Sequence, residues 1–434
     1  MKKRVLVRGP VLTLSGYGEH ARFVLRALKK REDELDIYIV PTIWGETGWL
    51  NIDDEEREWI DERVLKATAY MANQGAFDLS IQVTIPNEWQ LYAPINVGVT
   101  AGIETDRVSP VWLEKSNAMN KVITISEHSK RGFINTNYDG QNKDTGAPVH
   151  LTCETPVEIV HYPAKTNIFD NLKELDLNLD YDFNFLSVAQ WGPRKNLENT
   201  VKWFIEENID QKVGLVVKTH IKNGSVVDRK FTQAQLEGIV SNYPDKKCKV
   251  YLLHGDLSDE EMHSLYKHPK IKSLISLTHG EGFGLPIFEA AYSGLPIIAS
   301  DWSGHIDFLY TPFESKSNKS KKKHAKTKMH PSFANVEFTL GPIPPPAVWP
   351  GVLEENSMWC YAHEGSYKMK LRQVRKNYSK WTKKAAHLQE WILENFDYES
   401  QCEKLAAAMV DDYISPESEE GWLAEIESIV QEYE

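Results

Sequence analysis

The stretch Thr278–Ser300 reads THGEGFGLPIFEAAYSGLPIIAS, and it decides the fold class of this 434-residue chain. An apolar run ends in a loop with three glycines, Pro286 opens a short helical segment, and Gly294 precedes a second apolar run. Proline in the first turn of a helix and glycine just past its end are the expected helix boundaries. The stretch therefore predicts a strand, a glycine-rich loop, a helix and a strand of a parallel α/β unit.

The same alternation of short apolar runs and helical patterns extends to both sides of this stretch. It predicts parallel sheets that are covered by helices on both faces. The predicted strands are Arg4–Arg8, Leu35–Val40, Phe77–Thr84, Ile95–Thr100, Lys121–Ile125, Val157–His161, Phe183–Ala189, Lys212–Lys218, Lys249–Leu253, Ile271–Thr278 and Leu295–Ser300. The polar stretch Pro163–Asp180 divides them, so we expect two Rossmann-like, doubly wound domains facing across a cleft.

The domain boundaries follow from this division. Residues 1–165 form the first predicted domain and residues 181–385 the second, with a basic and proline-rich insertion at about 311–351. Helical patterns from Gly365 to Met409 and from Glu417 to Glu434 close the chain, and residues 386–434 are expected to form C-terminal helices.

Composition and charge narrow the class of protein. Hydrophobic residues make up 41% and charged residues 26%, as in ordinary globular enzymes. The net charge of −12 argues against a protein that binds nucleic acid over its whole surface. The four cysteines lack the spacing of a disulfide framework or a metal site. The basic N-terminus continues into a strand and does not resemble a signal peptide, and no apolar run is long enough to span a membrane. We therefore expect a cytoplasmic protein, in the host cytoplasm if the protein is viral.

The glycine-rich loop carries two carboxylates, Glu281 and Glu289. Glycines allow a ligand to approach the backbone, and the N–H groups at a helix start favour an anion such as a diphosphate. Carboxylates accept hydrogen bonds from vicinal hydroxyls, so the pair suits a hexose and a ribose. The alternative is a simple turn with Glu289 on a solvated helix face, since so short a spacing often arises by chance.

The full string from Glu281 to Ser300 resembles the signature of glycosyltransferase family 4 (group 1) and its GT-B relatives. The resemblance implies the GT-B architecture, with a last helix that crosses back onto the first domain. It also implies that Glu281 contacts the donor sugar, that Glu289 binds the nucleotide ribose, and that the backbone of Gly282, Phe283, Gly284 and Leu285 meets the donor.

A second segment, Phe185–Leu197 (FLSVAQWGPRKNL), resembles the family's loop in which an arginine and a lysine neutralise the donor diphosphate. Lys195 occupies the lysine position. Gln190 occupies the arginine position, and Arg194 lies close enough in sequence to substitute. Such cations stabilise a leaving diphosphate directly, so we expect no metal site, no cofactor and metal-independent catalysis. The predicted catalytic residues are Glu281, Lys195 and Arg194.

Weaker similarities extend the predicted site into other loops. The glycine-rich segment Leu14–Ala27 resembles the loop after the first strand of the same enzymes, and Leu253–Tyr266 resembles the stretch beside the nucleotide base. These segments add Gly16, Gly18 and Gly255 to the predicted donor-binding residues. Glu104, Asp106 and His20 are the predicted acceptor-side contacts, although His20 has an equally good interpretation as a structural residue.

The predicted function is transfer of a sugar, with retention, from a nucleotide-diphosphate sugar to an acceptor hydroxyl by front-face substitution. The expected acceptor is a glycan or a lipid-linked sugar. One alternative is a phage-type enzyme that glycosylates a hydroxymethylated DNA base, because the lysine-rich segment 316–328 could contact a polyanion or a membrane surface. Another is an inactive donor-binding remnant. The donor, acceptor, linkage and oligomeric state stay open.

Overall fold

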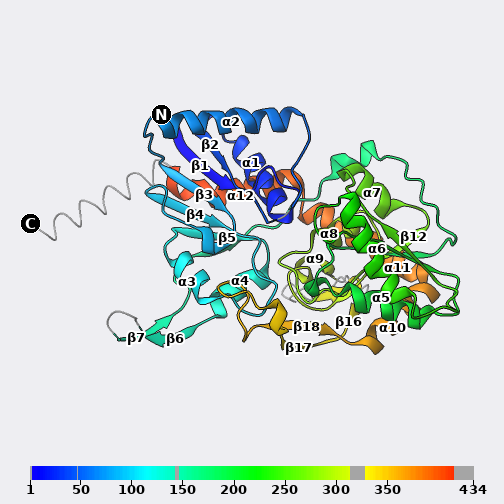
Figure 1. The fold of residues 1–434 in the computed structure, drawn as a ribbon. Helices are drawn as coiled ribbons and strands as arrows, with labels where there is room; N and C mark the ends of the chain where they lie inside the picture. The colour runs from blue at the N-terminus through cyan, green and yellow to red at the C-terminus, as the bar shows by residue number, and fades with distance from the viewer. Residues whose placement is uncertain (1, 46, 142–145, 313–327, 415–434) are drawn as a thin grey trace, which may run out of the picture.

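The computed structural model describes residues 2–45, 47–141, 146–312 and 328–414. Its two main layers are six-stranded sheets, each made of strands that pair in parallel (Figure 1). The lysine-rich segment 316–328 lies outside the described residues apart from Lys328, and so does the predicted helix at 417–434.

The N-terminal sheet has the strand order β2-β1-β3-β4-β5-β8. Its strands are β1 (Lys3–Gly9), β2 (Leu35–Pro41), β3 (Leu79–Val83), β4 (Ile95–Val99), β5 (Lys121–Thr124) and β8 (Val157–Ile159). Four helices connect them: α1 (Gly16–Lys29), α2 (Glu55–Ala72), α3 (Pro110–Asn117) and α4 (Glu127–Asn135). The Ser15 hydroxyl caps α1 by accepting a hydrogen bond from the Gly18 N–H group. A two-stranded hairpin, β6 (Tyr138–Gln141) and β7 (Pro148–Leu151), projects from this domain (Figure 1).

The C-terminal sheet has the strand order β11-β10-β9-β12-β13-β16. Its strands are β9 (Asn184–Val188), β10 (Gly214–Lys218), β11 (Lys249–Leu253), β12 (Ile271–Ser276), β13 (Ile297–Ser300) and β16 (Ala334–Val336). Numbered along the chain, this is the order 3-2-1-4-5-6, which reverses direction between β9 and β12. Ligands bind such sheets at the carboxyl ends of the two strands that flank the reversal.

The helices of the C-terminal domain connect and cover these strands. They are α5 (Leu197–Asn208), α6 (Val226–Val240), α7 (Asp259–Lys267), α8 (Leu285–Tyr292), α9 (Ile306–Leu309), α10 (Glu364–Lys376) and α11 (Tyr378–Asn395). Gly284, the N-cap residue of α8, has a φ of +91° in the left-handed region, and α8 ends before Gly294, whose φ is +82°. Glycine adopts both conformations without strain, which explains the spacing of glycines in this stretch.

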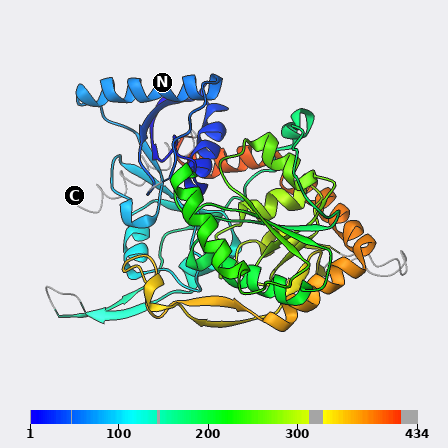
Figure 2. The same ribbon diagram turned by 45° about the vertical axis from the view of Figure 1, so that its right-hand side comes forward.

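The last described helix, α12 (Tyr398–Ile414), leaves the C-terminal domain and packs against α1. Figures 1 and 2 show it running from the end of α11 to the first strands and α1 of the N-terminal domain. Ion pairs hold it there: Lys30 pairs with Glu399, and Arg31 Nη1 lies 3.0 Å from Asp411 Oδ1. The Lys121 ammonium of β5 lies 2.6 Å from an Asp412 oxygen, which ties the same helix to the N-terminal sheet.

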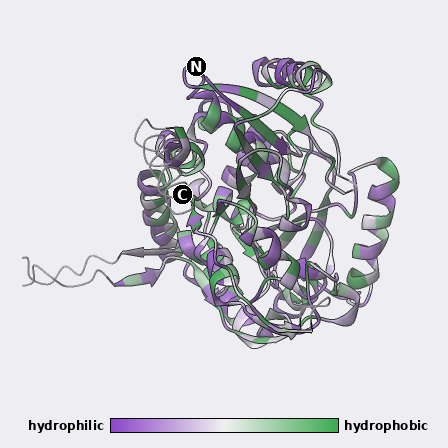
Figure 3. Cartoon of the chain, turned by 90° about the vertical axis from the view of Figure 1, so that its left-hand side faces the viewer, coloured by the Kyte–Doolittle hydropathy of each residue, from purple (hydrophilic) through white to green (hydrophobic). Residues whose placement is uncertain are grey.

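One hydrophobic core runs through both domains. The largest cluster of buried residues includes the N-terminal strands, the glycine loop, α8 and α12, and the rings of Tyr162 and Phe283 meet inside it at 5.2 Å between centroids. The strands of the sheets are mainly hydrophobic, whereas the outer helices carry many hydrophilic residues (Figure 3). The two domains are therefore packed against each other and are not joined by a linker alone.

The region after Thr311 differs from the expectation of a simple insertion. It supplies β16, the sixth strand of the C-terminal sheet, and two antiparallel pairs: β14 (Tyr310–Pro312) with β15 (Met329–Pro331), and β17 (Phe338–Pro342) with β18 (Met358–Ala362). Strands of three residues produce too weak a sequence pattern to be recognised. The helical pattern from Gly365 to Met409 also divides into three helices, with breaks at Asn377 and Phe396, where the backbone leaves the helical region.

Candidate functional site

The predicted catalytic residues meet at the strand-order reversal of the C-terminal sheet. Arg194 and Lys195 follow β9, and Glu281 follows β12, so all three lie at the carboxyl ends of the two flanking strands. The Lys195 Nζ atom lies 2.5 Å from Glu281 Oε1, and Arg194 Nη1 lies 3.1 Å from Glu281 Oε2. One carboxylate therefore binds both cations in the free protein.

Burial and charge together set the ionisation of this cluster. Burial alone would raise the pKa of Glu281, but the Lys195 and Arg194 charges lower it to about 2. Burial and the neighbouring Arg194 charge lower the pKa of Lys195, while the charges of Glu104 and Glu281 raise that of Arg194 against the effect of burial. At neutral pH the cluster holds an ionised carboxylate beside cations that are available to an incoming anion.

Strained backbone conformations flank this cluster. Asn196, directly after Lys195, has a φ of +51°, and Ser303 has a φ of +84°. The Ser303 hydroxyl accepts a hydrogen bond from the Glu281 N–H group at 3.0 Å. Non-glycine residues rarely adopt such conformations, which cost on the order of 1–3 kcal/mol each and concentrate at functional sites.

The glycine loop lies directly against a loop of the N-terminal domain. A Cβ atom on Gly280 would lie 1.9 Å from the Glu104 carbonyl oxygen, and one on Gly282 would lie 2.0 Å from the Ala101 carbonyl oxygen. The Ser126 hydroxyl, which also caps α4, donates a hydrogen bond to the Gly282 carbonyl oxygen at 2.5 Å. Glycine is thus required at these positions because two backbones from different domains touch here.

Backbone groups of the predicted donor loop are placed for anion binding. Helix α8 begins at Leu285 after Gly284. Because Pro286 has no N–H group and the Ile287 N–H group bonds to the Gly284 carbonyl oxygen, the first turn offers an anion the N–H group of Leu285. The Phe283 side chain does not face a ligand, because its ring is buried against Phe288 and Phe308. Phe283 can therefore contribute to donor binding through its backbone alone.

Glu289 lies apart from the cation cluster, one helix turn further along α8. Its Oε2 atom accepts a hydrogen bond from the Tyr266 hydroxyl at 3.0 Å. Burial, assisted by the charge of Asp259, raises the pKa of Glu289 to about 7, although the charge of Lys165 opposes the shift. In the free protein Glu289 is thus a carboxyl that titrates near neutral pH.

The three remaining predicted glycines occupy different surroundings. A Cβ atom on Gly16 would have no neighbour within 4 Å, whereas one on Gly18 would lie 2.1 Å from the Thr13 carbonyl oxygen. Gly255 follows β11 with a φ of +105°, and its carbonyl oxygen accepts a hydrogen bond from Lys218 Nζ at 2.7 Å. Gly16 and Gly255 leave open space beside the cleft, and Gly18 serves the turn into α1.

The three predicted acceptor residues have separate roles in the structure. Glu104 joins the cluster of predicted catalytic residues, with Arg194 Nη2 3.2 Å from its Oε1 atom. Asp106 accepts a hydrogen bond from the Met358 N–H group of the β17–β18 hairpin at 2.7 Å. His20 is 1% exposed and packs against Tyr162, and burial lowers its pKa to about 3. Only Glu104 therefore lies beside the donor loop.

The β17–β18 hairpin forms a contact between the domains that the sequence did not predict. The Gly351 carbonyl oxygen, in the connection between the two strands, accepts hydrogen bonds from Asn87 Nδ2 at 2.7 Å and from the Ser109 hydroxyl at 2.8 Å. Val352 joins the buried cluster of Trp89 in the N-terminal domain. Figure 2 shows this segment extending from the C-terminal domain to the N-terminal domain.

Two histidines near the cluster were also missed. His128, in the first turn of α4, packs edge-on against the Trp302 ring at 4.7 Å, and burial lowers its pKa to about 4. His305 is fully buried, its Nε2 atom lies 2.7 Å from the Ser300 carbonyl oxygen, and burial lowers its pKa. A histidine without neighbouring motif residues gives no sequence signal, so only the structure places these two here.

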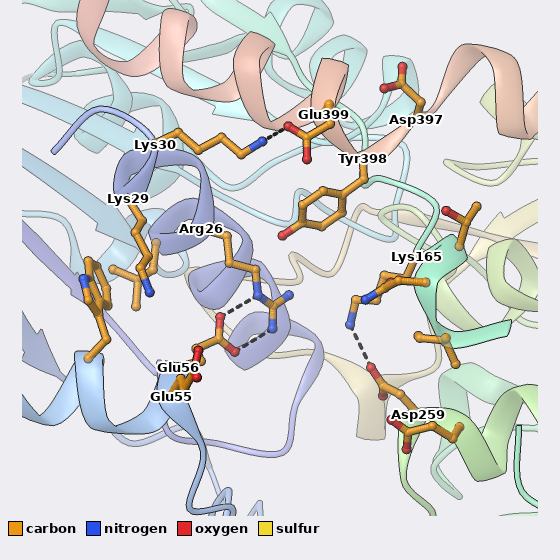
Figure 4. Close-up of a pocket in the computed structure, with 16 residues that line it drawn as sticks. Arg26, Lys29, Lys30, Glu55, Glu56, Lys165, Asp259, Asp397, Tyr398 and Glu399 are labelled. Carbon is orange, nitrogen blue, oxygen red and sulfur yellow. Dashed lines mark hydrogen bonds and ion pairs between the residues drawn. The ribbon is translucent and has the colours of Figure 1, made fainter. Parts of the chain in front are cut away.

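A charged cavity of about 920 Å³ lies at the hinge between the domains (Figure 4). Lys165 links both domains there, with Nζ 2.7 Å from Glu19 Oε1 and 3.0 Å from Asp259 Oδ2. Arg26 forms a pair with Glu56 on the opposite wall. The described residues that line this cavity include none of the predicted site residues, so the cavity is a feature of the hinge.

Within the described residues, no group of three or more histidine, cysteine, aspartate or glutamate side chains is arranged to hold a metal ion. The four cysteines are all free. No described helix is both long and apolar enough to cross a membrane.

Comparison with known proteins gives a family match within the C-terminal domain. Residues 173–311 match the sequence profile of the family described as Glycosyl transferases group 1. A serotype-specific mannosyltransferase, WbdA of Escherichia coli, is 30% identical over 139 residues, which are 31% of this chain and 16% of that protein. The chain therefore matches less than a fifth of the length of this curated relative.

Solved structures match nearly the whole chain. Anabaena HepE in complex with UDP and glucose superposes with a TM-score of 0.59 at 13% identity, over 94% of this chain and 100% of that one. Sucrose-phosphate synthase of Thermosynechococcus elongatus superposes with a TM-score of 0.60 at 12% identity, over 93% and 97%. The predicted two-domain fold is confirmed by these likenesses. Residues 173–311 are therefore similar to the group 1 glycosyltransferases, and the chain as a whole has the two-domain GT-B fold.

Proposed function

We propose that this protein transfers a sugar from a nucleoside diphosphate sugar to an acceptor hydroxyl, with retention of the anomeric configuration. The observation that carries the proposal is the cluster of Lys195, Arg194 and Glu281 at the strand-order reversal, next to the start of α8. Two cations and the helix N-terminus offer positive potential for a diphosphate, and the carboxylate beside them suits the donor sugar.

The proposed reaction is front-face substitution. The acceptor oxygen forms a bond to the anomeric carbon as the bond from that carbon to the β-phosphate oxygen breaks, and the departing phosphate takes the acceptor proton. Lys195 and Arg194 stabilise the charge on the leaving diphosphate, and Glu281, held by both cations, binds the sugar hydroxyls. Because these cations supply the positive charge, the proposal needs no metal ion.

A retaining double displacement fits the residues less well. That mechanism needs a carboxylate nucleophile facing the anomeric carbon. Glu281 forms ion pairs with Lys195 and Arg194, and Glu289, one helix turn further along α8, accepts a hydrogen bond from the Tyr266 hydroxyl. Both carboxylates are assigned to donor binding in the proposal, which leaves neither as a nucleophile.

The donor and acceptor classes are proposed from the relatives. The name of the E. coli relative specifies mannosyl transfer, and HepE was crystallised with UDP and glucose, so GDP-mannose and UDP-glucose are the first donors to test. We propose a glycan or a lipid-linked sugar as the acceptor. The DNA alternative depends on segment 316–328, which the structure describes only at Lys328, and no described contact favours it.

The first test is thermal unfolding with UDP, GDP, ADP, dTDP and CMP, comparing the wild-type chain with Glu289→Ala. A ligand that binds only the native state at a hundredfold excess over its Kd adds about 2.7 kcal/mol of stability. We expect one diphosphate to raise the Tm and the variant to lose most of that rise. No rise with any nucleotide contradicts the proposed donor site.

The second test determines the stereochemistry. UDP-glucose and GDP-mannose are incubated with the protein, and NMR identifies the anomer of the first sugar product, whether it is transferred or released to water. An α product from these α-linked donors supports retention, and a β product contradicts it. Nucleotide binding without transfer or hydrolysis identifies the chain as a donor-binding remnant instead.

A further inference from the structure

Exposed apolar side chains gather where the loop after β2 meets the loop after β1. Trp49 is 57% exposed and Leu14 is 43% exposed, and two backbone hydrogen bonds join the loops, from Leu14 N–H to the Gly48 carbonyl and from Leu50 N–H to the Leu12 carbonyl, each at 2.8 Å. Single exposed apolar residues are ordinary, but grouped ones mark binding surfaces. Both loops follow carboxyl ends of the N-terminal strands, on the side that faces the C-terminal domain (Figure 1).

This surface continues to the donor loop through a chain of contacts. The rings of Trp44 and Tyr17 lie 4.1 Å apart, and the Tyr17 hydroxyl lies 2.8 Å from Thr100 Oγ1. The next residue, Ala101, is the one whose carbonyl oxygen touches Gly282. The aromatic pair is therefore one residue removed from the backbone that meets the donor.

The charged residues around the two loops favour an uncharged ligand over an anionic one. Asp53, Asp54, Glu55 and Glu58 are exposed directly after Trp49 and Ile52, at the start of α2. They disfavour a phosphate-bearing lipid or a nucleic acid at this surface. The carboxylates of Glu104 and Glu88 act on Tyr17 from the cleft side, where they add to the effect of burial in raising the Tyr17 pKa. Carboxylates accept hydrogen bonds from sugar hydroxyls, and flat rings pack against the apolar face of a pyranose.

We propose that Trp44 and Trp49 form the acceptor platform, with Tyr17 packed against Trp44 as its support, and that its occupant is an uncharged pyranose glycan. The inference rests on the proposed transfer reaction and narrows its acceptor: the rings hold the sugar face, and Glu104 and Glu88 orient its hydroxyls beside the donor loop. A polyanionic acceptor is excluded by the acidic start of α2.

Saturation-transfer NMR on the full chain tests the platform with defined probes. The neutral probes are methyl α-mannopyranoside, maltotriose and chitotriose, and the anionic probes are a heparin tetrasaccharide and a duplex DNA. We expect a neutral probe to bind and its Kd to rise about three- to tenfold in Trp49→Ala, the loss typical of one aromatic contact. Trp349→Ala is the matched control, because Trp349 is 56% exposed on the β17–β18 connection.

The platform proposal is contradicted if Trp49→Ala binds the neutral probes as tightly as the wild type, or if Trp349→Ala loses as much affinity as Trp49→Ala. It is also contradicted if only the anionic probes bind, or if no probe binds. Trp44→Phe keeps a ring against Tyr17 and is expected to retain most of the affinity, which separates loss of stacking from loss of folding. Nucleotide-induced Tm shifts are measured in each variant. A missing shift in the wild-type chain refutes the proposed donor site, whereas an intact shift with unaltered glycan binding refutes the platform alone.

Discussion

Arg194 of the C-terminal domain and Glu104 of the N-terminal domain form an ion pair across the cleft, with 3.2 Å between Nη2 and Oε1. The same guanidinium binds Glu281 through Nη1 and donates to the Gly280 carbonyl oxygen at 2.7 Å. One side chain therefore connects the loop of Glu104 in the N-terminal domain to the glycine-rich loop that carries Gly280 and Glu281. Together with the contacts of Gly280 and Gly282, it joins the two domains at this point.

Replacing Lys195 with alanine is expected to lower kcat by about 10²–10³-fold, the usual cost of removing one preorganised charge at a developing anion. The change also leaves Glu281 with Arg194 as its sole partner among the cations of the cluster. The measurement is steady-state transfer or donor hydrolysis. Lys202→Ala, an exposed lysine on the neighbouring helix α5, is the control and is expected to keep full activity. Equal losses in both variants would show that the effect is not specific to the cluster.

Glu289 makes stability depend on pH in a predictable direction. Its folded pKa of about 7 lies above the ordinary value of 4.5. Between these values the folded carboxyl keeps a proton that the unfolded one has released, so wild-type stability falls as pH rises from 4.5 to 7. Glu289→Gln has no carboxyl group to ionise. Its unfolding free energy is therefore expected to exceed that of the wild type at pH 8 by about 1–3 kcal/mol and to equal it near pH 4.5.

The proposed ribose contact of the same carboxyl predicts the opposite pH dependence for nucleotide binding. Ribose hydroxyls donate to the ionised form, so affinity for the bound diphosphate is expected to increase between pH 6 and pH 8 in the wild type. The profile is expected to be flat and weaker in Glu289→Gln. Isothermal titration at four pH values measures it, and parallel profiles for the two proteins would remove Glu289 from the ribose site.

Gly282 and Gly16 are both predicted donor-binding glycines, but they should respond differently to alanine. The added methyl group of Gly282→Ala meets the Ala101 carbonyl at 2.0 Å, a backbone atom that cannot move aside, so the domains must separate there. We expect loss of nucleotide binding and a lower Tm. Gly16→Ala meets no atom within 4 Å, so its Tm should not change, and any loss of affinity would show that a ligand approaches Gly16.

Asp106 distinguishes a structural role from an acceptor contact. Asp106→Ala removes the acceptor of the Met358 N–H group, at an expected cost of about 1–2 kcal/mol in unfolding free energy. Asp106→Asn keeps an oxygen at that position and should recover most of the stability and activity. If the two variants lose activity equally while only the alanine variant is destabilised, the charge of Asp106 contacts the acceptor.

The fold could be predicted largely from the sequence because its signals are local. The boundaries of helix α8 can be read from Gly284 and Gly294, because the left-handed backbone conformation on each side of the helix favours glycine at that position. Repeated alternation of apolar runs and helical patterns predicted the two parallel sheets. The short strand β16 and the β17–β18 hairpin escaped prediction, because three-residue strands and proline-rich connections have no detectable period.

The sequence by itself determined which residues are candidates for donor binding: Glu281, Glu289 and Lys195 stand out in contiguous segments whose residue order is enough to mark them. Tertiary structure alone decided their partners. Sheet order brings the ends of β9 and β12 together, so Glu281 binds Lys195 and Arg194, and domain packing adds Glu104. The tertiary structure also places Asp106 against the β17–β18 hairpin and His20 in the hydrophobic core, and it raises the pKa of Glu289. These outcomes depend on the burial of each side chain and on its distance from charged residues far away in the sequence. Electrostatic energies depend on those distances in space, which the order of the residues does not give.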